Sequence, residues 1–340
     1  MAKKYDIAVL GVTSEVGEAL LELLVERKFP VGTLYPLASS WGAGETLDFR
    51  GKELPILDVD GFDFSRVQLA FFAADEAVAA TYAPKAAAAG CIVIDHSEHF
   101  RYEPDVPLVI PEVNPGALSQ CRERNIVASP DGVVIQMLTA LKPIYDAVGI
   151  TRINVATYQA VAASGRSAVE ELAQQTRALF SQQETEAEIY PKRIAFNVLP
   201  QIGAFQDNGY TREEMKLVWE TRKILEDETI AINPTAVRVP VFHGDAAAVH
   251  IETRDKIGAD AALALLQAAP GVVVLDEREP GGYPTSLDAV GEEAVYVGRI
   301  REDISHSHGL DLWLVQDYLR KGSALNGVQI AEILIAEYLD

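Results

Sequence analysis

Apolar runs, glycine-containing turns and amphipathic segments alternate along the N-terminal part of the chain. Residues 7–10 form a continuous apolar run, which is typical of a strand buried on both faces. A turn over residues 11–17 follows this run. Apolar side chains then recur at helical spacing, at Val16, Ala19, Leu20, Leu23 and Leu24. The order of strand, glycine turn and helix predicts the first βα unit of a dinucleotide-binding fold.

The same kind of pattern recurs up to residue 128. Buried-strand patterns are found at residues 67–72, 91–94 and 125–128. A helical pattern over residues 77–89 separates the first two of them. Strands alternating with helices predict a parallel sheet, so we expect this part of the chain to form an α/β domain.

The pattern changes beyond Gln136. Residues 150–161 form a longer strand pattern that is rich in β-branched residues, and helices are predicted to start near Ala168 and at Glu213. We therefore expect two domains. The predicted Rossmann-like domain covers residues 1–128 and 313–340, and the predicted α+β domain covers residues 129–312.

Composition limits the classes of partner. The 340 residues include 49% hydrophobic residues and carry a formal net charge of -21, which indicates a folded core and argues against nucleic acid and anionic membranes. The negative net charge does not exclude small anionic ligands. The two cysteines, Cys91 and Cys121, favour a reducing compartment over a disulfide scaffold. Residues 1–6 show no apolar leader, and no apolar run reaches the ~18 residues of a membrane helix. We therefore expect a cytoplasmic protein without a membrane span.

The stretch Ser129–Gln136 combines a strand end, a tight turn and a helix start. Ser129 and Asp131 are capping residue types, and Pro130 fits a first helical turn. The free N–H groups of such a helix start form a local anion site. Enzymes place a low-pKa cysteine at such a position because the helix dipole favours the thiolate.

This stretch and several others resemble the aspartate-semialdehyde dehydrogenase family. The family turn reads roughly N-P-N-C-[ST]-T-I-Q, where this chain has S-P-D-G-V-V-I-Q. Residues 95–114, 237–249 and 317–332 also match family patterns. The resemblance implies a Rossmann-type NAD(P)-binding domain and an α+β dimerisation domain. It also implies the family reaction, which is the NADP-dependent reductive dephosphorylation of aspartyl phosphate in amino-acid biosynthesis.

The resemblance implies a substrate- and anion-binding set that this chain retains. Its members are Arg101, Gln159, Glu220, Lys223 and Arg238. Other interpretations stay open for some of them. A lone loop arginine such as Arg101 is often a solvated charge, and Glu220 and Lys223 share one helix face as an exposed ion pair would.

The family's catalytic positions carry other residues. The nucleophile position falls on Gly132, so no thioester can form there, and the general acid/base position falls on Asp245. We expect this carboxylate to be ionised at pH 7, far from an imidazole's pKa. Tyr318 replaces an asparagine near the nicotinamide. The neighbouring His243 and His250 fit surface or core positions better than a replacement base, and we find no convincing metal-ligand spacing.

The cofactor loop is also altered. The cofactor-binding positions implied by the resemblance are Gly11, Thr13, Ser14, Glu15, Val16, Gly17, Ser39 and Trp41. Ser14 replaces a glycine that lets the pyrophosphate approach, and Glu15 adds negative charge. Trp41 replaces the arginine that faces the 2′-phosphate, and tryptophan cannot pair with a phosphate dianion. The family thus implies NAD(P), whereas these residues argue against it.

These substitutions resemble those of Usg-type paralogues, a branch without the catalytic cysteine and histidine. The first hypothesis is a catalytically disabled homologue with a binding or regulatory role. Such a protein would form a homodimer and bind a small anion. The alternative assembly is a heteromer with a true dehydrogenase subunit. The alternative is an enzyme of altered chemistry on a small anionic substrate, with Asp245 as base. A third hypothesis uses Cys121 or Cys91 as a displaced nucleophile.

Overall fold

A computed structural model describes residues 3–39 and 42–339. The chain divides into two compact units, one made of Met1–Pro130 and Ser323–Asp340 and the other of Asp131–Gly322. The sequence predicts that the chain returns to the first unit at residue 313, but this residue lies inside strand β14 (Gly309–Gln316). The structure places the return later because β14 pairs with β11 (Asp245–Thr253) of the second unit.

The first unit is built on a parallel six-stranded sheet in the order β5-β2-β1-β6-β7-β8. Its strands are β1 (Tyr5–Leu10), β2 (Val31–Ala38), β5 (Leu57–Asp58), β6 (Leu69–Phe72), β7 (Ile92–Asp95) and β8 (Ile126–Ala128). Every residue of β6 and β7 is buried, as expected for strands covered on both faces. The predicted Rossmann-type sheet is confirmed.

Helices and a small hairpin complete this unit. They are α1 (Glu15–Glu26), α2 (Glu76–Ala88), α3 (Cys121–Arg124), α9 (Leu325–Glu337) and the hairpin β3 (Thr46–Phe49) with β4 (Lys52–Pro55). Leu20, Leu23 and Leu24 of α1 are buried in the same core cluster as α9. The C-terminal helix begins at Leu325, after a π-helical turn over Arg320–Ala324. It therefore covers only part of the matching segment 317–332.

The second unit is built on a mixed six-stranded sheet in the order β10-β9-β11-β14-β13-β12. Its other strands are β9 (Ile150–Gln159), β10 (Ala231–Arg238), β12 (Val272–Val274) and β13 (Val295–Glu302). The strands β9 and β10 run parallel, whereas β11 pairs antiparallel with β9 and with β14. This confirms the predicted α+β domain.

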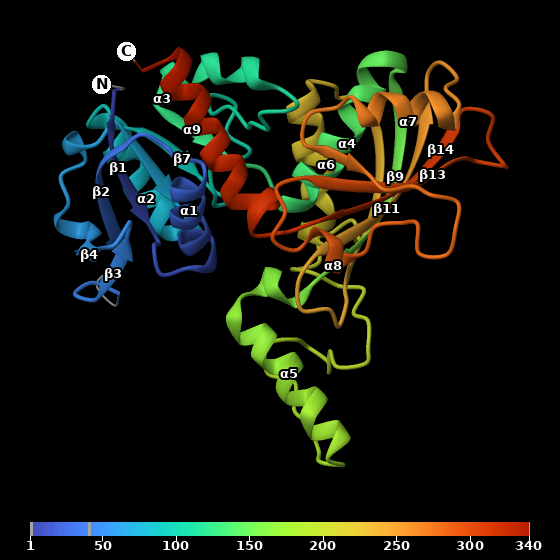
Figure 1. Ribbon diagram of the computed structural model, residues 1–340, viewed down its shortest axis with the longest axis horizontal. Coiled ribbons are helices and arrows are strands. Elements are labelled where there is room, and N and C mark those ends of the chain that lie inside the picture. Colours follow the sequence, from blue (N-terminus) through green and yellow to red (C-terminus); the bar gives the residue numbers. More distant parts are fainter. Residues whose placement is uncertain (1–2, 40–41, 340) are drawn as a thin grey trace. The chain divides into compact units, whose positions relative to one another are not determined.

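One long helix is the centre of this second unit. Helix α4 (Gly132–Val148) is buried continuously from Gly132 to Leu141, and it packs against the sheet and against α6 (Arg212–Leu225) and α7 (Ala259–Gln267) (Figure 1). The short α8 (Ser286–Ala289) packs on β14. Because the first ten residues of α4 are enclosed, its first residue has a fixed position relative to the strand ends around it.

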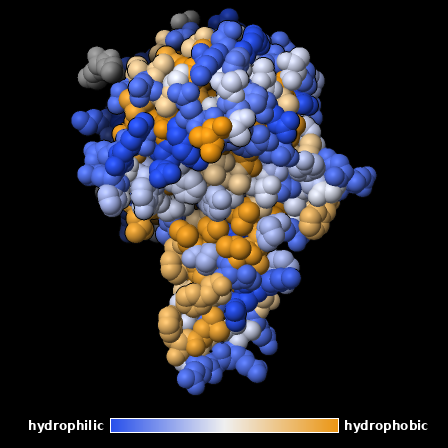
Figure 2. All heavy atoms as spheres, turned by 90° about the vertical axis from the view of Figure 1, so that its right-hand side faces the viewer, coloured by the Kyte–Doolittle hydropathy of each residue, from blue (hydrophilic) through white to orange (hydrophobic). Residues whose placement is uncertain are grey.

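Helix α5 (Arg166–Phe180) projects away from the sheet of its own unit (Figure 1). It has a small core of its own, which includes Leu172, Ile194 and Leu199. Hydrophobic residues gather on the surface of this projecting segment (Figure 2). Within the described residues, no helix is both long and apolar enough to span a bilayer.

Candidate functional site

The start of α4 differs in detail from the sequence prediction. Asp131 is the N-cap, and its side chain accepts a hydrogen bond from Val133 N at 3.2 Å. Ser129 does not cap the helix, because its hydroxyl accepts from Asn326 Nδ2 at 2.9 Å within the first unit. Pro130 precedes the cap and so lies outside the first turn. The capping carboxylate of Asp131 therefore already occupies part of the anion site at this helix start.

Gly132 is the first residue of α4 and is buried. It brings only its main chain to the site, and its carbonyl oxygen accepts a hydrogen bond from Gln316 Nε2 at 2.6 Å. Neither cysteine replaces the missing thiol. Cys91 and Cys121 are buried in the first unit, and burial raises the pKa of Cys91 to about 12 and also raises that of Cys121. The hypothesis of a displaced cysteine nucleophile is wrong for this structure, because such thiols are protonated at pH 7.

Asp245 lies at the first position of β11 and is completely buried. Its Oδ1 accepts from Ala160 N at 2.7 Å, whereas its Oδ2 has no hydrogen-bond partner. Burial raises the pKa of Asp245 to about 7, although the Ala160 hydrogen bond and the Arg238 charge oppose the rise. The expectation of a fully ionised carboxylate is therefore wrong, because it took no account of desolvation.

Two residues of the retained set meet at neighbouring strand ends. Gln159 ends β9 and Arg238 ends β10, and the two residues are register partners in the parallel pair. Arg238 Nη1 donates to Ala160 O at 2.6 Å, so Arg238 and Asp245 bind the main chain of the same residue, one at its carbonyl oxygen and the other at its N–H group. Both Arg238 and Gln159 are buried, while Arg238 Nε lacks a hydrogen-bond partner. Such an unsatisfied buried donor is costly and indicates a place for a ligand acceptor.

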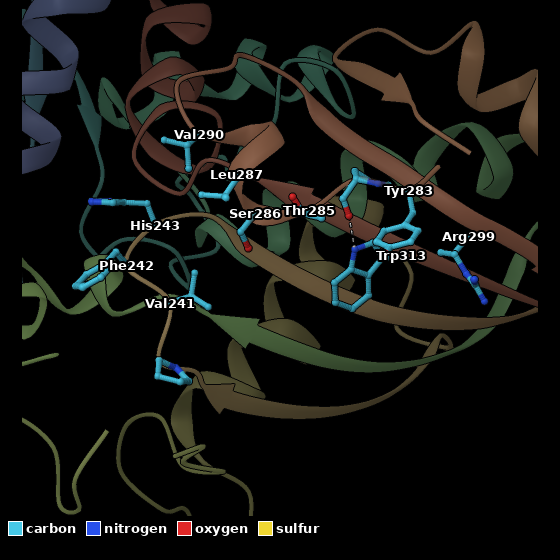
Figure 3. Close-up of a pocket in the computed structure, with 12 residues that line it drawn as sticks. Val241, Phe242, His243, Tyr283, Thr285, Ser286, Leu287, Val290, Arg299 and Trp313 are labelled. Atoms are coloured by element: carbon cyan, nitrogen blue, oxygen red, sulfur yellow. Dashed lines mark hydrogen bonds between the residues drawn. The ribbon is translucent and has the colours of Figure 1, made fainter. Parts of the chain in front are cut away.

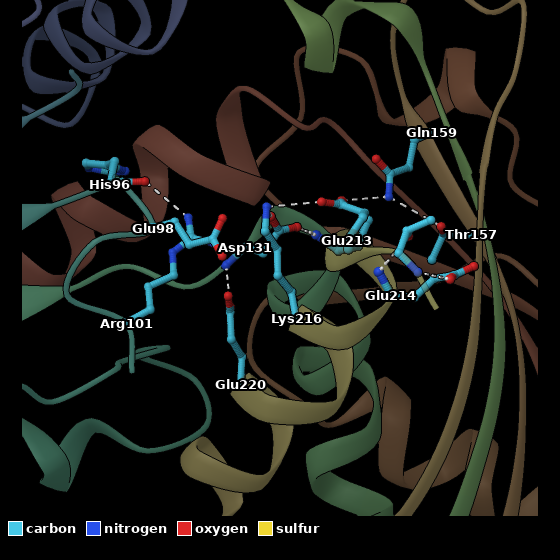
Figure 4. A network of polar contacts seen from close by, with 12 residues as sticks. His96, Glu98, Arg101, Asp131, Thr157, Gln159, Glu213, Glu214, Lys216 and Glu220 are labelled. Carbon is cyan, nitrogen blue, oxygen red and sulfur yellow. Dashed lines mark hydrogen bonds and ion pairs between the residues drawn. The ribbon is translucent and has the colours of Figure 1, made fainter. Parts of the chain in front are cut away.

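Helix α6 presents a row of charges to this site (Figure 4). Glu220 is completely buried, and its Oε2 accepts from Asp131 N at 2.7 Å. The interpretation of Glu220 as part of an exposed ion pair is therefore wrong. Lys223, which follows it on the same helix, is half-buried.

Sequence reasoning missed two residues of α6. Lys216 Nζ lies 3.1 Å from Glu213 Oε2 and 3.4 Å from Asp131 Oδ2, and Gln159 Nε2 donates to Glu213 Oε1 at 3.0 Å. Burial, followed by the nearby Asp131 charge, raises the pKa of Glu213. The available signal was helical spacing, because Glu213, Lys216 and Glu220 lie on one face of the helix.

Arg101 belongs to the first unit. It follows β7 and is buried, and its Nη2 donates to His96 O at 3.1 Å. The interpretation of Arg101 as a freely solvated loop charge is thus wrong. The carboxylate of Asp95, at the end of β7, is completely buried beside Ser97, whose hydroxyl donates to it at 2.7 Å.

The turn between β1 and α1 requires its two outer glycines. Gly11 has φ +81°, and a Cβ there would lie 2.2 Å from Ala73 O, while a Cβ on Gly17 would lie 2.3 Å from Gly11 O. Ser14 is the N-cap of α1, and its Oγ lies 3.1 Å from Gly17 N and 2.8 Å from Gly11 O. The hydroxyl therefore points into the turn, which removes the steric objection to a phosphate at this loop.

The structure describes all but one of the other predicted cofactor positions. Glu15 begins α1 and places its charge in the first turn, where it opposes a phosphate. Val16 is partly buried against the core, and Thr13 and Ser39 are exposed. Trp41 lies outside the described residues, so the structure does not bear on its predicted role.

The histidines near Asp245 lie in different surroundings. His243 is exposed in the turn before β11, which agrees with the surface position predicted for it. His250 Nδ1 lies 3.1 Å from Asp311 Oδ1 on the sheet. Among the residues that the structure describes, no group of histidine, cysteine, aspartate and glutamate side chains could hold a metal ion.

Two family models match most of the chain. The NAD-binding domain of semialdehyde dehydrogenases matches residues 6–121, and their dimerisation domain matches residues 141–321. The chain is 55% identical to an aspartate-semialdehyde dehydrogenase of Shewanella violacea over 99% of this chain and 100% of that protein. It is 54% identical to one from Legionella pneumophila, over 100% of this chain and 98% of that protein.

The solved structures agree with these relatives. The chain superposes with a TM-score of 0.97 on aspartate semialdehyde dehydrogenase II from Vibrio cholerae, which was crystallised in complex with ASA. That protein is 50% identical, and the match covers 99% of this chain and 100% of the other.

These similarities correct the functional hypotheses drawn from the sequence. The assignment to a disabled Usg-type paralogue is wrong, as is the alternative of an enzyme with altered chemistry, because the whole chain is 50–55% identical to proteins named aspartate-semialdehyde dehydrogenase. The chain nevertheless has glycine at position 132 and aspartate at position 245. The chain belongs to the aspartate-semialdehyde dehydrogenase family of oxidoreductases with an NAD(P)-binding domain.

Proposed function

We propose that this chain is an NADP-dependent oxidoreductase that acts on aspartate semialdehyde in amino-acid biosynthesis. The observation that carries the proposal is the match over the full length to dehydrogenases of this name, including a structure in complex with ASA. The polar groups around the start of α4 support it, because Lys216 connects the buried Gln159 and Glu220 into one set through Glu213 and the half-buried Asp131.

We assign substrate-binding roles to residues of the second unit. Arg238 is fixed by Ala160 O and keeps a buried, unpartnered Nε, which suits the carboxylate of an amino acid. The carboxylates of Glu213 and Glu220 suit its ammonium group. Gln159, held by Glu213, adds an amide that orients the ligand. Lys223 is the residue of this unit that we assign to anionic groups, and the anion-binding role of Arg101 stays a separate prediction for the first unit.

The first unit offers a turn that fits a dinucleotide. The close approaches at Gly11 and Gly17 are those of a tight strand-to-helix turn, and the inward Ser14 hydroxyl leaves the outer side of the turn to a phosphate. Thr13, Val16 and Ser39 are the other described residues that we assign to the cofactor, while the Glu15 charge weakens this binding. When bound, NADP supplies the hydride acceptor.

We also propose that the family's nucleophile and base positions are those of Gly132 and Asp245. A substrate held here cannot form a thioester with residue 132, because glycine has no side chain. Asp245 adds a carboxyl group whose pKa of about 7 allows both protonation states at neutral pH.

The test is a direct assay of the pure protein. Aspartate semialdehyde is added with NADP or NAD, with and without phosphate, and NADPH formation is followed by absorbance. Calorimetry measures binding of each compound alone. An Arg238→Lys variant is the matched control, since it keeps the charge but loses the planar guanidinium, and it should bind the semialdehyde at least ~10-fold more weakly. Failure to form NADPH at any concentration of semialdehyde would refute the oxidoreductase proposal.

We propose that two copies of the chain associate through the second unit. The matched family model is a dimerisation domain, and the unit has an open apolar pocket of about 1150 Å³ (Figure 3). Phe242 and Leu287 line it, with exposed fractions of 43% and 85%. Large exposed apolar side chains in one cluster are typical of a protein interface. The heteromer with a second dehydrogenase subunit stays a prediction that co-purification would test.

A further inference from the structure

The first residue of α4 is enclosed by a loop that follows β14 in the same unit. An ideal Cβ on Gly132 would lie 2.9 Å from Tyr318 Cδ2 and 3.1 Å from its Cε2. The same Cβ would lie 3.0 Å from Gly322 O. Real Cβ atoms essentially never show the first of these separations, and the other two are shorter than nine in ten real Cβ contacts. The space beside the Gly132 Cα is therefore already filled, on one side by an aromatic ring and on another by a carbonyl group.

Hydrogen bonds hold this loop against the helix. Gln316 Nε2 donates to Gly132 O at 2.6 Å, and Gln316 is completely buried. Gly322 N donates to Asp317 O at 3.0 Å, which closes the loop around Tyr318. A Cβ on Gly322 would in turn lie 3.3 Å from the Gly132 Cα. The main chain of the loop thus has little freedom to retreat from α4, so only the Tyr318 side chain can make room.

We propose that Tyr318 is a specificity-determining residue of the site at the start of α4, because its ring occupies the volume that a side chain at position 132 would take. The ring then forms the wall that a ligand meets at the first turn of the helix. Residues 132 and 318 act as a matched pair, in which a side chain at one position requires a shorter side chain at the other. The role as a ligand wall rests on the proposed function, whereas the steric pairing does not.

The experiment introduces a thiol at position 132 and varies the ring opposite. The variants are Gly132→Cys alone and the same substitution combined with Tyr318→Ala or with Tyr318→Phe. The phenylalanine variant is the matched control, since it keeps the ring and removes only the hydroxyl. Alkylation of the introduced thiol by iodoacetamide is followed at neutral pH. Tyr318→Ala alone gives the background, which should be low because Cys91 and Cys121 are buried.

We expect the thiol to react at least tenfold faster in the Gly132→Cys/Tyr318→Ala protein than in Gly132→Cys or in the phenylalanine control. Equal rates in all three proteins would overturn the proposal, because the ring would then be no obstacle. A fast reaction in the phenylalanine control but not in Gly132→Cys would also overturn it, since the hydroxyl and not the ring would then be responsible.

A second measurement applies if Gly132→Cys does not fold. Melting temperatures are compared for the unmodified protein, Tyr318→Ala, Gly132→Ala and their combination. We expect Tyr318→Ala to lower the melting temperature less in the Gly132→Ala background than in the unmodified protein, and equal shifts would overturn the pairing. Neither readout uses NADP or aspartate semialdehyde, so failure of this inference and failure of the proposed function are separable.

Discussion

The buried carboxyl of Asp245 leads to a sharp prediction about pH and stability. Its pKa is about 7 in the folded protein, against an ordinary value of 3.8 for an aspartate carboxyl group, and burial is the largest cause. Between these two pH values the folded state keeps a proton that the unfolded chain has released. Stability therefore falls as pH rises through this window, and it changes no further from this group above pH 7. A shift of this size corresponds to roughly 4 kcal/mol between the two ends.

The perturbation is Asp245→Asn, which resembles the protonated carboxyl and cannot ionise. The Oδ1 atom of the asparagine can still accept the hydrogen bond from Ala160 N. The amide nitrogen of the asparagine takes the position of Asp245 Oδ2, which has no hydrogen-bond partner. The free energy of unfolding of this variant should therefore not show the decrease with rising pH that ionisation of Asp245 causes in the unmodified protein. Relative to the unmodified protein, it should thus gain roughly 4 kcal/mol on going from pH 4 to pH 8. Any cost of the amide itself is the same at every pH and cancels.

The assay is urea unfolding of both proteins at several pH values from 4 to 8. Fluorescence of Trp219 and Trp313 reports on the second unit, because both lie in its elements α6 and β14. Subtracting the two stabilities at each pH removes the contributions of all other groups. Asp207→Asn is the control, since its exposed carboxylate loses little hydration on folding. A difference for Asp245→Asn that stays flat within about 1 kcal/mol would refute the argument from desolvation.

Two further predictions concern other parts of the chain. Ser14→Ala removes the N-cap of α1 and should cost about 1 kcal/mol of stability, whereas Ser14→Gly should cost only a few tenths; thermal melting of both variants measures this, and the reverse order would contradict the capping role. Leu287→Glu places a charge on an apolar side chain that is 85% exposed and should shift the chain from dimer to monomer, as measured by sedimentation. A dimer that persists unchanged would place the interface elsewhere.

The sequence by itself determined the fold class and the family. Apolar patterns with periods of 2 and 3.6 are local, so the alternating strands and helices of the first unit, and the first long strand and several helix starts of the second, could be predicted from neighbouring residues. The strand pattern over residues 150–161 included Gln159, whereas the strand that ends at Arg238 was found only in the structure. The glycine at position 132 could also be identified at once, because a missing nucleophilic atom needs no structure to be recognised.

Only the tertiary structure decided the environment of these residues. The raised pKa of Asp245 depends on burial by segments far away in sequence, and so does the enclosure of Glu220. The direction of the Ser14 hydroxyl and the ring of Tyr318 beside Gly132 depend on side-chain packing. Sequence patterns specify which face of an element is apolar, but desolvation and close contact arise from atoms brought together by folding, which no local pattern records.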